Sequence, residues 1–140
     1  MKRTLIIPLL LTTATALHGQ GVTTRTIAWS CSKVFEASTS RLEVVANKLT
    51  TYKVDSIVWR NAKGLKKTLT IKKVVGSWLD TNTIGEVLYQ VERGQQRGTV
   101  LIKKSAGGTM IRIVLTEASG STAPATPAIT ELTVSGILDL

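Results

Sequence analysis

The chain has 140 residues, 18 of them basic and 9 acidic, so its formal net charge is +9. It contains one histidine and one cysteine, which removes the commonest catalytic and zinc-binding constellations and any disulfide framework within the chain. With 43% hydrophobic residues it can still bury a sizeable core without such supports.

The first twenty residues have the composition of a cleavable secretory signal. Lys2 and Arg3 precede an apolar run over 5–11, and small residues follow at 14, 16 and 19. A membrane anchor is the alternative, but the apolar run is shorter than the roughly 20 residues of a spanning helix. We therefore expect cleavage after about residues 16–20 and export to the periplasm or the extracellular space. The expected mature chain, 21–140, is a single domain with no transmembrane segment, and its 16 basic and 9 acidic residues give it a net charge of +7.

The mature chain begins with an expected strand and continues with an expected helix. Residues 21–29 are rich in threonine and other β-branched residues, which favours a strand. Apolar residues at 42, 45, 46 and 49 have the spacing of one helix face, and Ser40 lies three residues before Glu43, as in a capping box. This pattern predicts an amphipathic helix over about 41–49. Positions 42, 44 and 46 also fit strand alternation, which leaves a small all-β barrel as the alternative fold.

The rest of the chain is expected to form strands joined by tight turns. Each linking segment contains the glycine, asparagine or aspartate that a reversal needs. The residues 117–128 have the small-residue and proline content of a flexible connection. The expected fold is α+β, an antiparallel β-meander of six to seven strands with the helix packed on its apolar face. After the first strand, the strands expected are 51–59, 65–75, 86–92, 99–104, 109–116 and 129–138.

The residues that could carry catalysis or bind a metal are few. His18 lies in the expected signal, so the mature chain can form neither a Cys–His pair nor a Ser–His–Asp triad. The segment 80–86 matches a calcium loop only in part, because Val91 stands where the last carboxylate is needed. We therefore expect no enzyme activity, no cofactor and no bound metal. The remaining candidates for an enzyme based on two carboxylates have no spacing that singles out a pair: Asp55, Asp80, Glu86, Glu92 and Glu117.

The tryptophans and the cysteine suggest structural positions. Trp29, Trp59 and Trp78 lie at the ends of expected strands, where an indole ring can cap a core. The tripeptide 76–78 is the G-x-W found near the first strand of lipocalin-type barrels, but here it lies midway along the chain, and three residues identify no family. Cys31 has mostly small or apolar neighbours, which favours a buried thiol over pairing with another chain.

Positive charge is the clearest functional signal. Residues 63–73 contain five lysines, and strand alternation divides them between two faces and two ends. Threading the expected meander brings several of them, with arginines from other turns, to one end of the sheet. Such a basic cluster would attract anions through its summed potential. Its expected members are Arg60, Lys63, Lys66, Lys67, Arg93 and Arg97.

Three functional hypotheses follow. The first is a non-catalytic binding domain whose basic cluster contacts an anionic surface or polymer, such as an acidic glycan or the cell envelope. Nucleic acid is less favoured, because few aromatic side chains accompany the charges. The second is a carrier of an apolar small molecule in a pocket between helix and sheet. The third is a carboxylate-based enzyme. A charge that only keeps the domain soluble explains the cations equally well.

Overall fold

The computed structural model describes residues 21–117 and 126–140. In these residues the chain forms nine strands and a three-residue 3-10 helix, and it forms no α-helix. None of its helical structure there is long and apolar enough to cross a bilayer. The expected signal, 1–20, and most of the expected connection, 118–125, lie outside the described residues. The elements are η1 (Val22–Thr24), β1 (Thr26–Glu36), β2 (Arg41–Glu43), β3 (Asn47–Tyr52), β4 (Ser56–Arg60), β5 (Lys66–Val75), β6 (Gly85–Arg93), β7 (Gln96–Ser105), β8 (Gly108–Glu117) and β9 (Ala128–Asp139).

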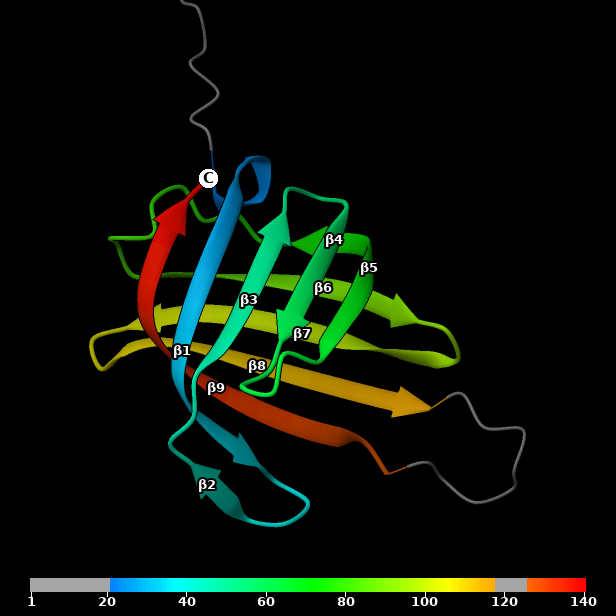
Figure 1. Ribbon diagram of the computed structural model, residues 1–140. Helices are drawn as coiled ribbons and strands as arrows, with labels where there is room; N and C mark the ends of the chain where they lie inside the picture. The colour runs from blue at the N-terminus through cyan, green and yellow to red at the C-terminus, as the bar shows by residue number, and fades with distance from the viewer. Residues whose placement is uncertain (1–20, 118–125) are drawn as a thin grey trace, which may run out of the picture.

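Eight of the strands close into an antiparallel barrel (Figure 1). From β3 to β9 each strand pairs with the next, and β1 pairs with β3 on one side and with β9 on the other. The β1–β9 ladder runs from Ile27 opposite Asp139 to Glu36 opposite Thr130, with two irregularities near Cys31. The ninth strand, β2, continues the pairing of β1 beyond the end of β3. This closure removes the exposed sheet edges that an open meander would leave.

The α+β prediction is wrong, and the all-β barrel that was the alternative is the observed fold. The residues expected to form a helix over 41–49 lie in β2, in the connection 44–46 and in the start of β3. Ser40 lies in a turn with a positive φ of 50°, so it caps no helix. Arg41 pairs with Glu43 at 2.9 Å, because side chains two residues apart share one face of a strand. A strand is favoured here because β3 is hydrogen-bonded on both sides, to β1 and β4, whereas an isolated helix of this length is marginal.

The later strands were predicted better than the earlier ones. The last five expected strands correspond to β5 through β9 to within three residues at each end. The expected strand 51–59 is wrong, because a tight turn divides it into the end of β3 and β4. In that turn Lys53 has a φ of 51°, and the backbone N–H of Asp55 donates to the carbonyl of Tyr52 at 3.0 Å. The expected strand 21–29 begins late, at Thr26, after η1.

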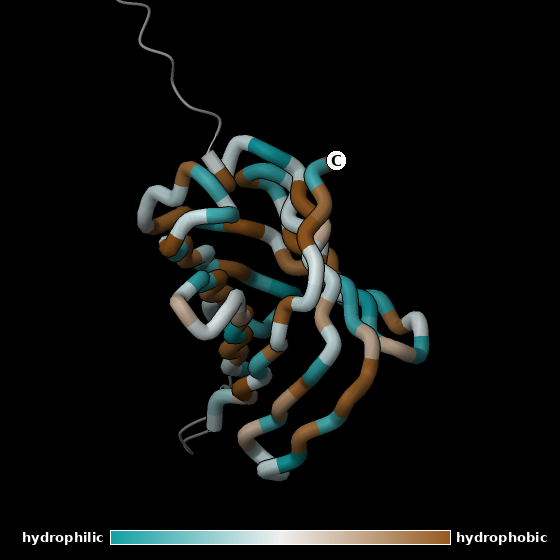
Figure 2. Tube along the Cα trace, turned by 90° about the vertical axis from the view of Figure 1, so that its left-hand side faces the viewer, coloured by the Kyte–Doolittle hydropathy of each residue, from teal (hydrophilic) through white to brown (hydrophobic). Residues whose placement is uncertain are grey.

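The barrel interior is filled with apolar side chains over most of its length. Strand alternation places one face of each strand inside, and hydrophobic and hydrophilic positions alternate along the chain (Figure 2). An eight-stranded barrel is just wide enough for such side chains to fill it. Fully buried side chains come from strands all around the barrel, among them Leu49, Ile57, Leu69, Tyr89, Ile102, Ile113 and Leu132.

One end of the barrel is closed by tryptophans. Trp78, in the connection between β5 and β6, is 3% exposed and stacks on Trp29 of β1 with ring centroids 6.1 Å apart. Its carbonyl accepts a hydrogen bond from the backbone N–H of Val22 in η1. Gly85 leaves room for the indole, since a Cβ there would lie 2.2 Å from a ring atom. We call this the closed end.

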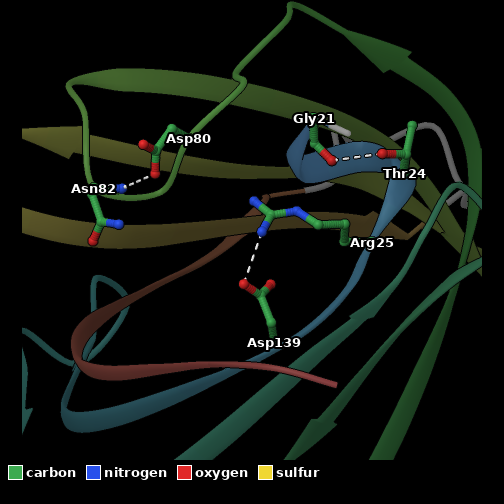
Figure 3. A network of polar contacts seen from close by, with 6 residues as sticks. All are labelled: Gly21, Thr24, Arg25, Asp80, Asn82 and Asp139. Atoms are coloured by element: carbon green, nitrogen blue, oxygen red, sulfur yellow. Dashed lines mark hydrogen bonds and ion pairs between the residues drawn. The ribbon is translucent and has the colours of Figure 1, made fainter. Parts of the chain in front are cut away.

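Polar contacts connect the segments that surround the closed end (Figure 3). Arg25 forms an ion pair with Asp139 at 2.8 Å, which joins the first and last strands of the barrel. Asp80 accepts a hydrogen bond from the backbone N–H of Asn82 at 2.8 Å. The Lys104 ammonium donates to the carbonyls of Thr81 and Asn82. The segment 80–86, which partly matches a calcium loop, therefore contributes two backbone carbonyls that accept hydrogen bonds from a lysine.

Candidate ligand-binding site

The opposite end, here called the open end, contains a pocket of about 330 Å³. It lies between the chain around β2 and the start of β3 on one side and the β4–β5 turn on the other. Its charged lining consists of two carboxylates, Glu36 and Glu43, and two ammonium groups, Lys63 and Lys67. Its apolar lining comes from both sides and from the barrel wall: Val34, Val45, Trp59, Ala62 and Leu65.

Trp59 forms the fixed base of this pocket. It lies on the inward face of β4, and its indole N–H donates to the side-chain oxygen of Asn47 at 3.0 Å. Asn47 is itself buried, so this hydrogen bond satisfies a polar group that would otherwise be costly to bury. Lys67 is directly opposite Trp59 in the β4–β5 ladder, and its ammonium lies 5.0 Å from the indole ring centroid. The base of the pocket therefore combines the aromatic face of Trp59 with the ammonium group of Lys67, which can move because the lysine side chain is flexible.

The β4–β5 turn holds one wall of the pocket in place. The side-chain oxygen of Asn61 accepts hydrogen bonds from the backbone N–H groups of Lys63 and Leu65, at 3.0 and 2.9 Å. Gly64 has a φ of 80°, a conformation that glycine adopts without steric cost. These contacts fix the backbone that carries Lys63 and Leu65 at the rim.

A second, smaller pocket of about 190 Å³ adjoins the first. The two pockets share Glu36, Trp59 and Lys67. The smaller one reaches down to Ile113 and Leu115 of β8, where the filled core begins. Trp59 and Lys67 thus lie between an outer groove and the inner mouth of the barrel.

The six cations predicted from the sequence lie at or near the open end, but they do not form one cluster. Lys63 and Lys67 line the pocket, whereas Arg60 and Lys66 lie opposite one another on the outward face of β4 and β5. Arg97 lies 3.6 Å from Glu92, and Arg93 donates to Gln96 at 3.4 Å. Strand alternation divides these cations between the mouth and the outer wall. Whether any of them binds an anion stays a prediction.

Sequence reasoning missed most of the apolar side of the pocket. Val45 and Asn47 fall in the region 41–49 that was interpreted as a helix, which would have placed them on a different surface, and Val34 was assigned to no element. The alternation at positions 42, 44 and 46 was the available signal for a strand. Leu65 was expected at the start of a strand, and nothing in its local pattern indicates that the preceding turn folds over Trp59.

Two of the carboxylates considered as catalytic candidates lie beside cations. Glu86 lies 3.8 Å from Lys103, and Glu92 lies close to both Lys72 and Arg97. No three histidine, cysteine, aspartate or glutamate side chains come together in the part of the chain that the structure describes. Cys31 is buried, as the sequence favoured, and its burial raises the pKa of the thiol to about 12, so the reactive thiolate is disfavoured.

The closed end is therefore packed, and the open end carries the features of a binding site. Its pocket has an aromatic base, apolar walls and charged groups at the rim, the combination by which small-molecule sites hold and orient a ligand. Comparisons of this chain with protein-family models, with curated proteins and with solved structures gave no match.

Proposed function

We propose that this protein is an exported carrier that binds a small, mainly apolar molecule at the open end of its barrel. The observation that supports this function is the pocket of about 330 Å³ built on Trp59. Its volume falls within the range of about 300–1,000 Å³ that small-molecule sites occupy. Export rests on the composition of residues 1–20, which predicts a secretory signal.

The charged side chains at the rim indicate which kind of ligand fits the pocket. An entirely apolar molecule would leave Lys63, Lys67 and Glu36 desolvated without partners, which is unfavourable. Glu43 is already paired with Arg41. A ligand with an apolar body and one polar or charged end fits the lining better, its body against Trp59 and its polar end at the rim.

The pocket supports this function better than binding of an anionic polymer in the mouth. A polymer would need the predicted cations to face one surface, and they face two. The pocket also differs from the one expected by sequence reasoning, which lay between a helix and a sheet. It lies instead at the rim, above a barrel interior that side chains already fill.

The test is a titration of the mature protein with 1-anilinonaphthalene-8-sulfonate, a dye with an apolar ring system and one charged end, whose fluorescence rises when it leaves water. We expect saturable binding that also changes the tryptophan emission, because Trp59 is the half-buried tryptophan in the pocket while Trp29 and Trp78 lie at the closed end. Trp59→Leu should weaken dye binding roughly tenfold, since an aromatic contact of about 1–1.5 kcal/mol is lost.

A matched pair of leucines provides the control. Leu65 and Leu79 are both 64% exposed, but only Leu65 lines the pocket. Leu65→Ser should weaken dye binding about threefold or more, because it removes an apolar side chain from the pocket wall, and Leu79→Ser should leave it unchanged. Equal effects of the two substitutions, or wild-type affinity in both Trp59→Leu and Leu65→Ser, would remove the pocket as the binding site.

A further inference from the structure

Three cations form one row on the outside of the barrel beside the open end. Lys48 of β3 is directly opposite Arg60 of β4, and Arg60 is directly opposite Lys66 of β5. All three side chains are exposed, and their positions alternate with the inward residues of their strands. We call Lys48, Arg60 and Lys66 the basic ladder. Lys48 was not among the cations that the sequence singled out.

The basic ladder is unfavourable for the folded protein alone. Directly opposite side chains on neighbouring strands lie about 4.5–5.5 Å apart, and like charges at that spacing destabilise a sheet. In residues 21–117 and 126–140 no carboxylate lies within ion-pair distance of the three cations. The next outward row on the same strands is neutral: Thr50, Val58 and Thr68.

A hollow of about 540 Å³ adjoins the basic ladder on the outer wall. Lys48 and Arg60 line it, together with the serines at 30, 32 and 135. The hydroxyl of Ser135 donates to the backbone carbonyl of Ser30 at 3.2 Å, which ties β9 to β1 beside the hollow. The two cations and the hydroxyl groups of Ser30 and Ser32 can donate hydrogen bonds to the oxygens of a phosphate group. The wall therefore offers an anion both a positive potential and hydrogen-bond donors.

Exposed apolar side chains lie near the same wall. Val44 is 76% exposed and lines the hollow, and Leu42, in the adjoining β2, is 60% exposed. Cations together with protruding apolar side chains suit the surface of an anionic lipid membrane, where headgroup phosphates meet the ends of acyl chains. An acidic polysaccharide would use the cations but would gain little from the apolar residues.

We propose that the basic ladder and the exposed side chains of Leu42 and Val44 dock the protein on a membrane containing anionic phospholipids. The hollow and the ligand pocket share a wall formed by residues 45, 47, 61 and 62. Docking would hold the mouth of the pocket beside the lipid surface, from which an amphipathic ligand could be collected. The docking surface does not depend on the pocket being a carrier site, because its residues face outward.

The test measures binding of the mature protein, without added ligand, to two kinds of vesicle. One contains phosphatidylcholine alone, and the other contains phosphatidylcholine mixed with phosphatidylglycerol. We expect binding to the anionic vesicles that weakens steeply with salt, and much weaker binding to the neutral ones. The triple variant Lys48→Gln, Arg60→Gln, Lys66→Gln should bind the anionic vesicles about 100-fold more weakly, from roughly fivefold per cation.

A charge-matched variant separates docking from net charge. Lys53→Gln, Lys73→Gln, Lys103→Gln removes three exposed cations from the other half of the barrel, so its net charge equals that of the ladder variant. We expect the affinity of this control to fall by less than about threefold. The ladder variant should unfold at the wild-type urea concentration or higher, and the control at or slightly below it, because Lys103 forms an ion pair with Glu86. Equal losses of affinity in the two triple variants would overturn the proposal, as would wild-type binding by the ladder variant.

The contribution of the exposed apolar side chains to binding distinguishes a membrane from a polysaccharide as the partner. Leu42→Ser together with Val44→Ser should weaken binding to anionic vesicles about tenfold, because serine side chains do not insert among acyl chains, and should leave retention on heparin unchanged. Retention on heparin that depends on the basic ladder, combined with no binding to anionic vesicles, would assign this wall to an acidic polysaccharide and overturn the membrane proposal. None of these outcomes depends on dye binding in the pocket.

Discussion

The two ends of the barrel use the same residue types in opposite ways. At the closed end Trp78 is fully packed against Trp29, and Arg25 is paired with Asp139. At the open end Trp59 is only partly buried, and the cations of the basic ladder lie opposite one another. The closed end therefore contributes stability, whereas the open end keeps an aromatic face and positive charge available to other molecules.

The largest expected effect on stability comes from removing the closed end's tryptophan plug. Trp78→Ala should lower the free energy of unfolding by about 3–5 kcal/mol, because a large buried side chain is removed and a cavity remains beside Trp29. Trp59→Ala should lower it by only about 2 kcal/mol, since that ring faces a pocket and little new cavity forms, although Asn47 loses its hydrogen-bond donor. Urea unfolding followed by circular dichroism measures both values. Equal decreases would show that the two ends are packed alike.

The next effect appears at alkaline pH and tests the filled interior. Burial raises the pKa of Cys31 from 9.0 to about 12 and that of Tyr89 from 10.0 to about 12. Each group is neutral in both states below its unfolded pKa, where its full contribution to stability is present. As pH rises through the window from about 9 to 12, only the unfolded chain ionises readily, so the free energy of unfolding falls.

Substitution of the buried tyrosine separates this effect from general alkaline denaturation. Tyr89→Phe should reduce the loss of stability between about pH 10 and 12, whereas Tyr52→Phe, at an exposed tyrosine, should not. Urea unfolding measured at several pH values provides the comparison. An identical pH dependence in the wild type and in Tyr89→Phe would show that the Tyr89 hydroxyl titrates normally in the folded protein.

A smaller effect is expected from relieving the basic ladder. Arg60→Glu places a carboxylate between Lys48 and Lys66 and should raise the free energy of unfolding by about 0.5–1 kcal/mol at low ionic strength. Added salt should reduce this gain, because the side chains are exposed. The same substitution should weaken binding to anionic vesicles. A loss of stability would mean that the three cations do not repel one another in the folded protein.

The smallest expected effect is that of Tyr89→Phe at neutral pH. The Tyr89 hydroxyl is buried, and no atom of the described residues forms a hydrogen bond with it. Its removal should therefore change the free energy of unfolding by less than about 1 kcal/mol in either direction. A loss of more than about 2 kcal/mol in urea unfolding would reveal a hydrogen-bond partner for the hydroxyl.

The later part of the barrel could be predicted because its strands alternate cleanly and because β6, β7 and β8 are joined by short turns that contain glycine. The first part could not, because residues 41–49 satisfy both helical and strand spacing, and only pairing with β1 and β4 decides between them. The turn at 53–55 was missed because it contains no glycine or proline. The sequence predicted that several cations lie at the open end. It did not predict whether each of them faces the mouth or the outer wall, because this depends on the register between neighbouring strands, and local sequence patterns do not determine that register.

The pairing of β1 with β9 also has a consequence for how the protein folds. Ile27 pairs with Asp139, so the first and last strands must meet before the barrel is complete. Contacts between such distant parts of a chain make folding slow, because the loop between them must be ordered first. Until β9 arrives, β1 and β8 present unpaired backbone groups that can join other chains. A chain that crosses a membrane unfolded would therefore have to remain unaggregated until its last strand emerges.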